Sequence, residues 1–145
     1  MKNHQTLLAL EETLANSYLL MLKTQNYHWN VVGENFKSLH ELFQVQYEEL
    51  FVAIDEIAER IRAIGSKVEG SFEGFSQLSK FKKGDKNSDS KTMINSLVAD
   101  HDELAKSLKL AVKTAQEELD EGTADMFIGR IKAHEKAIWM LESSR

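Results

Sequence analysis

Apolar residues recur every three or four positions from Phe36 to Ile64, and this repeat constrains the fold more than any other feature of the chain. Such spacing places them on one face of an α-helix. The chain has no proline and only seven glycines, so little interrupts a long helix. We therefore expect one helix over residues 35–64, capped by Asn35 and ended by Gly65. The stripe consists of Phe36, Leu39, Phe43, Tyr47, Leu50, Ile54, Ile57, Ile61 and Ile64.

Similar stripes predict three more long helices. The first runs from about residue 4 to 31, and Gly33 closes it. Another begins near residue 90 and continues to about Leu119. The sequence DEGTAD then turns the chain, with Thr123 as the expected N-cap of the last helix. The candidate N-caps of the helix near residue 90 are Ser88, Asp89 and Ser90.

Residues 66–89 differ from these helical segments because glycine and serine are frequent and the aromatic residues are scattered. We expect a long connection there, with a short helix around residues 72–78. Two helices, a long connection and two further helices form the ferritin-like arrangement of a four-helix bundle. The sequence therefore predicts an all-α fold with residues 1–145 as one domain.

The composition argues against several kinds of site and partner. Without cysteine the chain has no disulfide, thiolate metal site or cysteine nucleophile. No stretch approaches the roughly 18 apolar residues of a membrane span. Acidic residues follow the N-terminus too soon for a signal peptide, so we expect a cytoplasmic protein. The net charge of −5 attracts cations and disfavours binding to phosphate backbones.

Four side chains are candidate metal ligands: His28, His40, Asp55 and Glu59. The two carboxylates are one helical turn apart, which is also the usual spacing of a solvated acidic stripe. They border apolar positions, which favours a covered surface. The two histidines flank the turn at Gly33, so antiparallel helices would bring both to one end of the hairpin. Taken singly, each histidine is also a candidate packing residue.

Helix length separates the two pairs of ligands. His40 and Asp55 are fifteen residues apart on one helix, which is roughly 22 Å. A metal–ligand bond is only about 2 Å long, so the two pairs cannot share a metal within one chain. Two copies of this helix packed antiparallel about a two-fold axis would bring the histidines of one copy to the carboxylates of the other, twice over.

The long helix is apolar on more than its core stripe. Val45, Phe51, Val52 and Ala58 lie off the line of the main repeat, which indicates that a second face is covered. A second copy of the chain is one candidate for the cover. The other is the connection over residues 66–89, folded across the helix as a lid. We favour the second copy, because it would also complete the metal site.

These residues together resemble the signature of the Dps proteins, which are mini-ferritins named as DNA-binding proteins from starved cells. The combined spacing is specific and spans nearly the whole chain. No glutamate precedes a histidine by three positions, so the pair that larger ferritins use inside one bundle is absent. The matching positions are His28-Trp29, Gly33, Phe36, Leu39-His40, Phe43, Tyr47, Asp55, Ala58-Glu59-Arg60, His134-Glu135-Lys136 and Trp139-Met140-Leu141.

The resemblance implies a hollow dodecamer that oxidises Fe(II), preferentially with hydrogen peroxide, and stores the ferric mineral in its cavity. This ferroxidase activity would protect the cell against oxidative damage. The resemblance also implies that His28 and His40 of one subunit, with Asp55 and Glu59 of another, bind the iron. Trp29 is a candidate for electron transfer, and its alternative role is that of an interface aromatic.

Two features refine this expectation. Many members carry an aspartate four residues after the second histidine, but this chain has Gln44, a neutral and poorer ligand for a second iron. Acidic residues also gather near the start of the last helix, where three copies around a three-fold axis would attract cations. They are Asp120, Glu121 and Asp125. Similar proteins place entry pores in this region, with Asp125 the best match, whereas helix capping explains such residues equally well.

Two other functions compete with iron storage. One is a nucleoid-compacting DNA-binding protein with secondary iron binding. The chain shows no lysine-rich tail, and aspartates interrupt its basic segment, residues 80–91, which we interpret as a solvated loop. We therefore expect little direct DNA binding. The other is a structural bundle whose histidines only pack.

Overall fold

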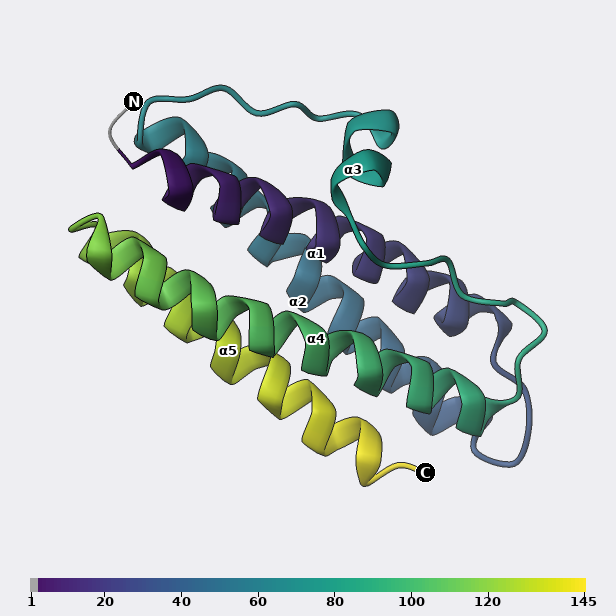
Figure 1. Cartoon of the computed structure of the whole chain (residues 1–145). Coiled ribbons are helices and arrows are strands. Elements are labelled where there is room, and N and C mark those ends of the chain that lie inside the picture. The colour runs from purple at the N-terminus through teal and green to yellow at the C-terminus, as the bar shows by residue number, and fades with distance from the viewer. Residues whose placement is uncertain (1–2) are drawn as a thin grey trace.

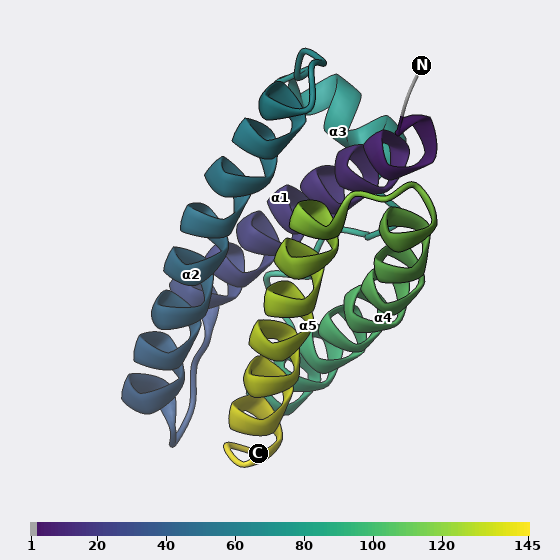
Figure 2. The same ribbon diagram turned by 90° about the vertical axis from the view of Figure 1, so that its left-hand side faces the viewer.

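The computed structural model describes residues 3–145, whose five helices form two antiparallel hairpins (Figure 1). The first hairpin pairs α1 (His4–Asn30) with α2 (Phe36–Ala63), and the second pairs α4 (Ser90–Glu117) with α5 (Glu121–Glu142). Figure 2 shows these four helices gathered into one bundle. The connection from α2 to α4 runs along the bundle and carries α3 (Phe72–Leu78). The predicted ferritin-like four-helix bundle with a short middle helix is confirmed.

The core of the bundle follows the predicted stripes. One apolar cluster surrounds Ile57 and Phe127, and a second surrounds Phe43 and Leu97. Burial of such side chains is the main favourable term in folding. Despite their length, none of the helices between residues 3 and 145 is apolar enough to cross a membrane. The buried positions of the α2 stripe are Leu39, Phe43, Leu50, Ile57 and Ile61.

Two of the predicted helix ends have the expected chemistry. Gly65 has φ +102° and follows α2, and the amide of Ser66 donates to the carbonyl of Ile61 at 3.1 Å. This is a Schellman ending, in which glycine avoids the strain of a left-handed backbone. Asp89 caps α4, accepting a bond from the amide of Thr92 at 2.7 Å. Asn35 stands at the N-cap of α2 but makes no side-chain capping bond.

The predicted N-cap of the last helix is wrong. Asp120, not Thr123, caps α5, and its carboxylate accepts from the Thr123 amide at 3.0 Å and from the Thr123 hydroxyl at 2.6 Å. A carboxylate suits the positive end of the helix dipole better than a hydroxyl. Arg60 also pairs with Asp120 at 2.9 Å. Burial raises the pKa of Asp120, but the bonds from Thr123 and Arg60 outweigh it and leave the pKa lowered.

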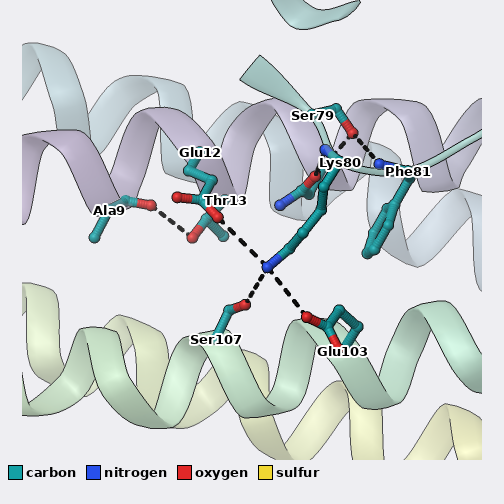
Figure 3. A network of polar contacts seen from close by, with 9 residues as sticks. Ala9, Glu12, Thr13, Ser79, Lys80, Phe81, Glu103 and Ser107 are labelled. Atoms are coloured by element: carbon teal, nitrogen blue, oxygen red, sulfur yellow. Dashed lines mark hydrogen bonds and ion pairs between the residues drawn. The ribbon is translucent and has the colours of Figure 1, made fainter. Parts of the chain in front are cut away.

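Ion pairs and hydrogen bonds hold the middle connection across the groove between α1 and α4 (Figure 3). Lys80 Nζ lies 3.7 Å from Glu12 of α1, and 3.2 Å from Glu103 and 3.0 Å from Ser107 of α4. Beside it, the buried Asn16 accepts bonds from the Ser79 hydroxyl at 2.8 Å and from the Lys80 amide at 3.1 Å. Lys80 is therefore not a freely solvated part of the basic segment.

The two hairpins are also joined at the start of the chain. Glu118, just after α4, accepts bonds from the amide of Thr6 at 2.6 Å and from the amide of Gln5 at 3.3 Å. The Thr6 hydroxyl bonds to the same carboxylate. These amides belong to the first turn of α1, which has no intrahelical acceptor for them. Glu118 thus caps α1 from the other hairpin, and the hydrogen bonds lower its pKa.

Candidate metal centre

The two histidines of the first hairpin lie against each other. His28 belongs to the last turn of α1 and His40 to the second turn of α2. Their ring centroids are 3.8 Å apart and the ring planes differ by 13°. Phe36 stacks on His40 at 5.1 Å, and Tyr47 meets His28 edge-on at 5.3 Å. The predicted meeting of both histidines at one end of the hairpin is confirmed.

Reciprocal hydrogen bonds hold the pair. His28 Nδ1 lies 2.6 Å from the carbonyl oxygen of His40, and His40 Nδ1 lies 2.7 Å from the carbonyl oxygen of His28. A carbonyl oxygen only accepts hydrogen bonds, so each Nδ1 must carry a proton. In the neutral imidazole, each Nε2 then keeps its lone pair. This is how a metal-binding histidine is commonly oriented, with the far nitrogen anchored to the backbone.

The two carboxylates occupy another stretch of α2. Asp55 and Glu59 are exposed and line one open groove together with Tyr18, Met21 and Phe51. Within residues 3–145 neither carboxylate forms an ion pair. Oxygen ligands of this kind, left free on a partly apolar surface, are available to a hard cation.

The structure does not bring the two ligand pairs together within one chain. Both His40 and Asp55 lie on α2, a single continuous helix, as the length argument requires. No group of three or more histidine, aspartate or glutamate side chains among the described residues is arranged to hold a metal ion. A site with all four ligands would therefore need a second copy of the chain.

The second apolar face of α2 lies open. Val45 is 62% exposed, Phe51 66% and Val52 58%, while Ala58 is partly buried. The middle connection does not cover these three side chains, and its buried aromatic, Phe75, belongs to the core cluster of α1 and stacks on Tyr18. The lid interpretation is therefore wrong for this part of α2. A row of large exposed apolar residues is typical of a protein–protein contact.

The expected pore residues differ in their surroundings. The carboxylate of Asp120 is buried and bonded to Arg60 and Thr123, so it does not face solvent. Glu121 and Asp125 are exposed in the first turns of α5. Trp29 is likewise exposed, at the edge of a groove between α1 and the segment over residues 83–87.

One buried polar group was not predicted. His101 of α4 and His134 of α5 place their Nδ1 atoms 2.8 Å apart in the core. The guanidinium of Arg130 lies 3.3 Å from His134 and pairs with Glu49 of α2. Each histidine continues the apolar stripe of its own helix, so the sequence does indicate that each ring is buried. Sequence spacing within each helix does not show that the two helices bring them together.

Comparisons with known proteins agree on one family. The ferritin-like domain matches residues 7–144. The chain is 46% identical over 136 residues to an uncharacterized low temperature-induced protein of Nostoc sp., covering 92% of this chain and 76% of that one. It is 37% identical over 134 residues to the DNA protection during starvation protein of Brevibacillus brevis, covering 92% and 90%.

A solved structure extends this similarity to the fold. The Dps protein of Vibrio cholerae O1 superposes with a TM-score of 0.93 at 31% identity, covering 98% of this chain and 89% of that one. That protein is described as a member of a broad superfamily of ferritin-like diiron-carboxylate proteins.

Proposed function

The chain belongs to the Dps family of ferritin-like proteins, and from this premise we propose that it oxidises Fe(II) and stores the ferric product in a hollow shell of identical subunits. Hydrogen peroxide is the preferred oxidant in this proposal. Each Fe(II) gives up one electron, so one peroxide accepts electrons from two Fe(II) ions as its O–O bond breaks. Hydrolysis of the ferric ions releases protons and yields an oxyhydroxide mineral. The reaction removes Fe(II) and peroxide together and so limits oxidative damage.

The anchored pair of imidazoles is the observation that carries this proposal. His28 and His40 each bond a backbone carbonyl through Nδ1, at 2.6 and 2.7 Å, and so present Nε2 as a potential ligand. Asp55 and Glu59 supply oxygen ligands. Mixed nitrogen and oxygen ligands suit Fe(II), and the carboxylates also stabilise the Fe(III) product. In the proposed site all four residues are iron ligands and take part in the ferroxidase reaction.

The arrangement of α2 supports a site shared by two subunits. If His40 lies beside the partner subunit's Asp55 and Glu59, antiparallel α2 helices must cross near residues 48–49, midway between these positions. The exposed Val45, Phe51 and Val52 flank that midpoint. Their burial would stabilise the two-fold contact, at about 25 cal/mol per Å² of apolar surface. The same two-fold contact would thus bring the ligands together and bury the exposed apolar residues of α2.

Assembly beyond the dimer follows the family in this proposal. Twelve subunits at −5 each give 12 × −5 = −60 before counterions, which would draw Fe(II) toward the shell. Glu121 and Asp125 are the proposed entry residues, because Asp120 is committed to capping α5. Trp29 stays a candidate for passing electrons, since it adjoins His28.

A first experiment tests oxidation and storage. The metal-free protein is mixed anaerobically with Fe(II), hydrogen peroxide is added, and ferric absorbance is followed while particle size is measured. Rapid oxidation with iron retained in a large particle is expected. A small species that leaves the iron to precipitate would refute the proposal. A mobility-shift assay with duplex DNA tests the alternative of nucleoid compaction, for which we expect little binding.

A second experiment tests the sharing of sites. One variant carries His28→Ala with His40→Ala, and the other carries Asp55→Asn with Glu59→Gln. Each alone should lose fast oxidation. When equal amounts are unfolded together and co-assembled, a shared site is intact at about one quarter of positions, because the histidines and carboxylates come from different chains. Recovery to about that level supports sharing, and no recovery in well-assembled shells contradicts it.

A further inference from the structure

A chain of polar side chains crosses the bundle core, and its member on α2, Glu49, lies between the candidate ligands His40 and Asp55 in the sequence. Both terminal nitrogens of Arg130 donate to the carboxylate of Glu49 on α2. Arg130 Nη2 also lies 3.3 Å from His134 Nε2, and His134 Nδ1 lies 2.8 Å from His101 Nδ1. The chain therefore joins α2, α5 and α4.

The donors and acceptors along this chain can be assigned. An arginine only donates hydrogen bonds, so His134 Nε2 must accept and His134 Nδ1 must carry the proton. His134 then donates to His101 Nδ1, which leaves the proton of His101 on Nε2. Burial lowers the pKa of His101 to about 3 and, together with the neighbouring charge, lowers that of His134, so both rings are neutral at pH 7.

The free end of the chain faces a small cavity. Within residues 3–145, His101 Nε2 is buried without a hydrogen-bond partner. The same holds for Gln46 Oε1 of α2, whose amide nitrogen donates to the Ala137 carbonyl at 3.4 Å. Both residues line one partly open cavity of about 120 Å³ where α2, α4 and α5 meet. A buried donor or acceptor without a partner costs roughly 1–3 kcal/mol. The remaining lining residues are Leu42, Val45, Glu49, Ala133, Lys136, Ala137 and Met140.

We propose that this cavity binds a water molecule that accepts a hydrogen bond from His101 Nε2 and donates one to Gln46 Oε1. The space exceeds the roughly 10–15 Å³ that a water needs, and the site offers one donor and one acceptor. The bound water completes the polar chain and links α2 to α4. It adds to two direct links between α2 and α5, the Glu49–Arg130 pair and the bond from the Gln46 amide to the Ala137 carbonyl.

The charges around the cavity favour a neutral occupant. A cation is disfavoured because His101 would point an N–H donor at it. The positive charge of Arg130, 3.3 Å from His134, would also repel it. An anion would lie beside Gln46 Oε1, an acceptor, and near the carboxylate of Glu49. Arg130 already pairs with Glu49, and Lys136 lies at the same cavity. Water satisfies both unpaired atoms without leaving a buried charge.

A high-resolution crystal structure of the whole protein tests this inference. We expect one ordered solvent peak within about 2.7–3.2 Å of both His101 Nε2 and Gln46 Oε1. In solution, NMR should show the Nε2 proton of His101 with a cross-peak to a long-lived water. An empty cavity, or a direct bond between His101 Nε2 and a protein acceptor, would overturn it. Neither outcome depends on iron chemistry.

Two variants make the test specific. Gln46→Leu removes the acceptor while keeping similar bulk, so the solvent peak and its cross-peak should be lost. Lys136→Ala removes an exposed charge at the same cavity and should leave both signals in place. An unchanged solvent peak in Gln46→Leu would refute the role of Gln46. If Gln46→Leu does not fold, the crystal and NMR measurements on the unaltered protein still decide the proposal.

Discussion

His28 and His40 anchor each other, because each imidazole bonds the backbone carbonyl of the other residue while the two rings stack 3.8 Å apart. The arrangement joins the end of α1 to the start of α2 across the turn at Gly33. It therefore serves the fold as well as the candidate site. Each residue thus orients the imidazole of the other, and Phe36 and Tyr47 pack against the pair.

This geometry predicts the tautomers of the metal-free protein. NMR that correlates ring nitrogens with carbon-bound protons should show His28 and His40 protonated on Nδ1 near neutral pH, because carbonyl oxygens accept from those atoms. His101 provides an internal control with the opposite tautomer, since its proton belongs on Nε2. Protonation of either His28 or His40 on Nε2 alone would contradict the proposed presentation of ligands.

Substitution of Gln44 tests whether the proposed site can hold a second iron. Its amide donates to Glu48 at 2.9 Å, one turn further along α2. We expect Gln44→Asp to add an oxygen ligand near His40 and to increase anaerobic Fe(II) binding by calorimetry, from one strong ion per site towards a second. Gln44→Asn is the matched control, because it changes length without adding charge. Equal Fe(II) binding by the aspartate and asparagine variants would remove Gln44 from consideration.

Periodicity predicted the helices well because each long helix buries one continuous stripe. The α2 stripe from Phe36 to Ile64 fixed the element to within a residue at each end. The start of α5 was harder to predict, since Asp120, Glu121 and Thr123 are all plausible near a helix N-terminus. Arg60, from a distant part of the chain, pairs with Asp120 and so favours Asp120 as the N-cap of α5.

The candidate site was predictable to the extent that it is local. His28 and His40 are joined by a short turn, so chain geometry brings them together. His101 and His134 meet only because α4 and α5 pack in one particular register, which no spacing within either helix reveals. The sharing of the iron ligands between subunits depends on a helix length that the sequence does show, and it stays a proposal.

Leu119 has a strained backbone conformation. Its φ is +61° and its side chain is 88% exposed at the end of α4. A left-handed backbone costs a branched residue about 1 kcal/mol or more, whereas glycine adopts it freely. We expect Leu119→Gly to raise the free energy of unfolding by about 0.5–1 kcal/mol in urea titrations. Leu119→Ala keeps the strain and should change stability little, so a gain from alanine as large as that from glycine would point to loss of the apolar side chain instead.

Acid should weaken the bundle through His101 and His134. Both are buried and neutral, and burial lowers both pKa values, that of His101 to about 3. In the unfolded chain a histidine titrates near its ordinary pKa of 6.5. Between these values the unfolded state binds more protons than the folded state, so stability falls as pH falls. Protonating either ring would also place a positive charge close to Arg130, which pairs with Glu49, while Lys136 lies at the neighbouring cavity.

Below pH 6.5, we expect the free energy of unfolding to fall by up to about 1.4 kcal/mol per pH unit for each histidine as the pH is lowered. Urea unfolding at pH 7.0, 6.0 and 5.0 measures it, and this range lies above the titration of most carboxylates. His101→Leu removes one of the two groups and should make the slope shallower, although it lowers stability at pH 7 by leaving His134 without its acceptor. His4→Gln, at an exposed position, should leave the slope unchanged. If His101→Leu and the unaltered protein lose stability in parallel between pH 7 and 5, the buried pair is not the source of acid sensitivity.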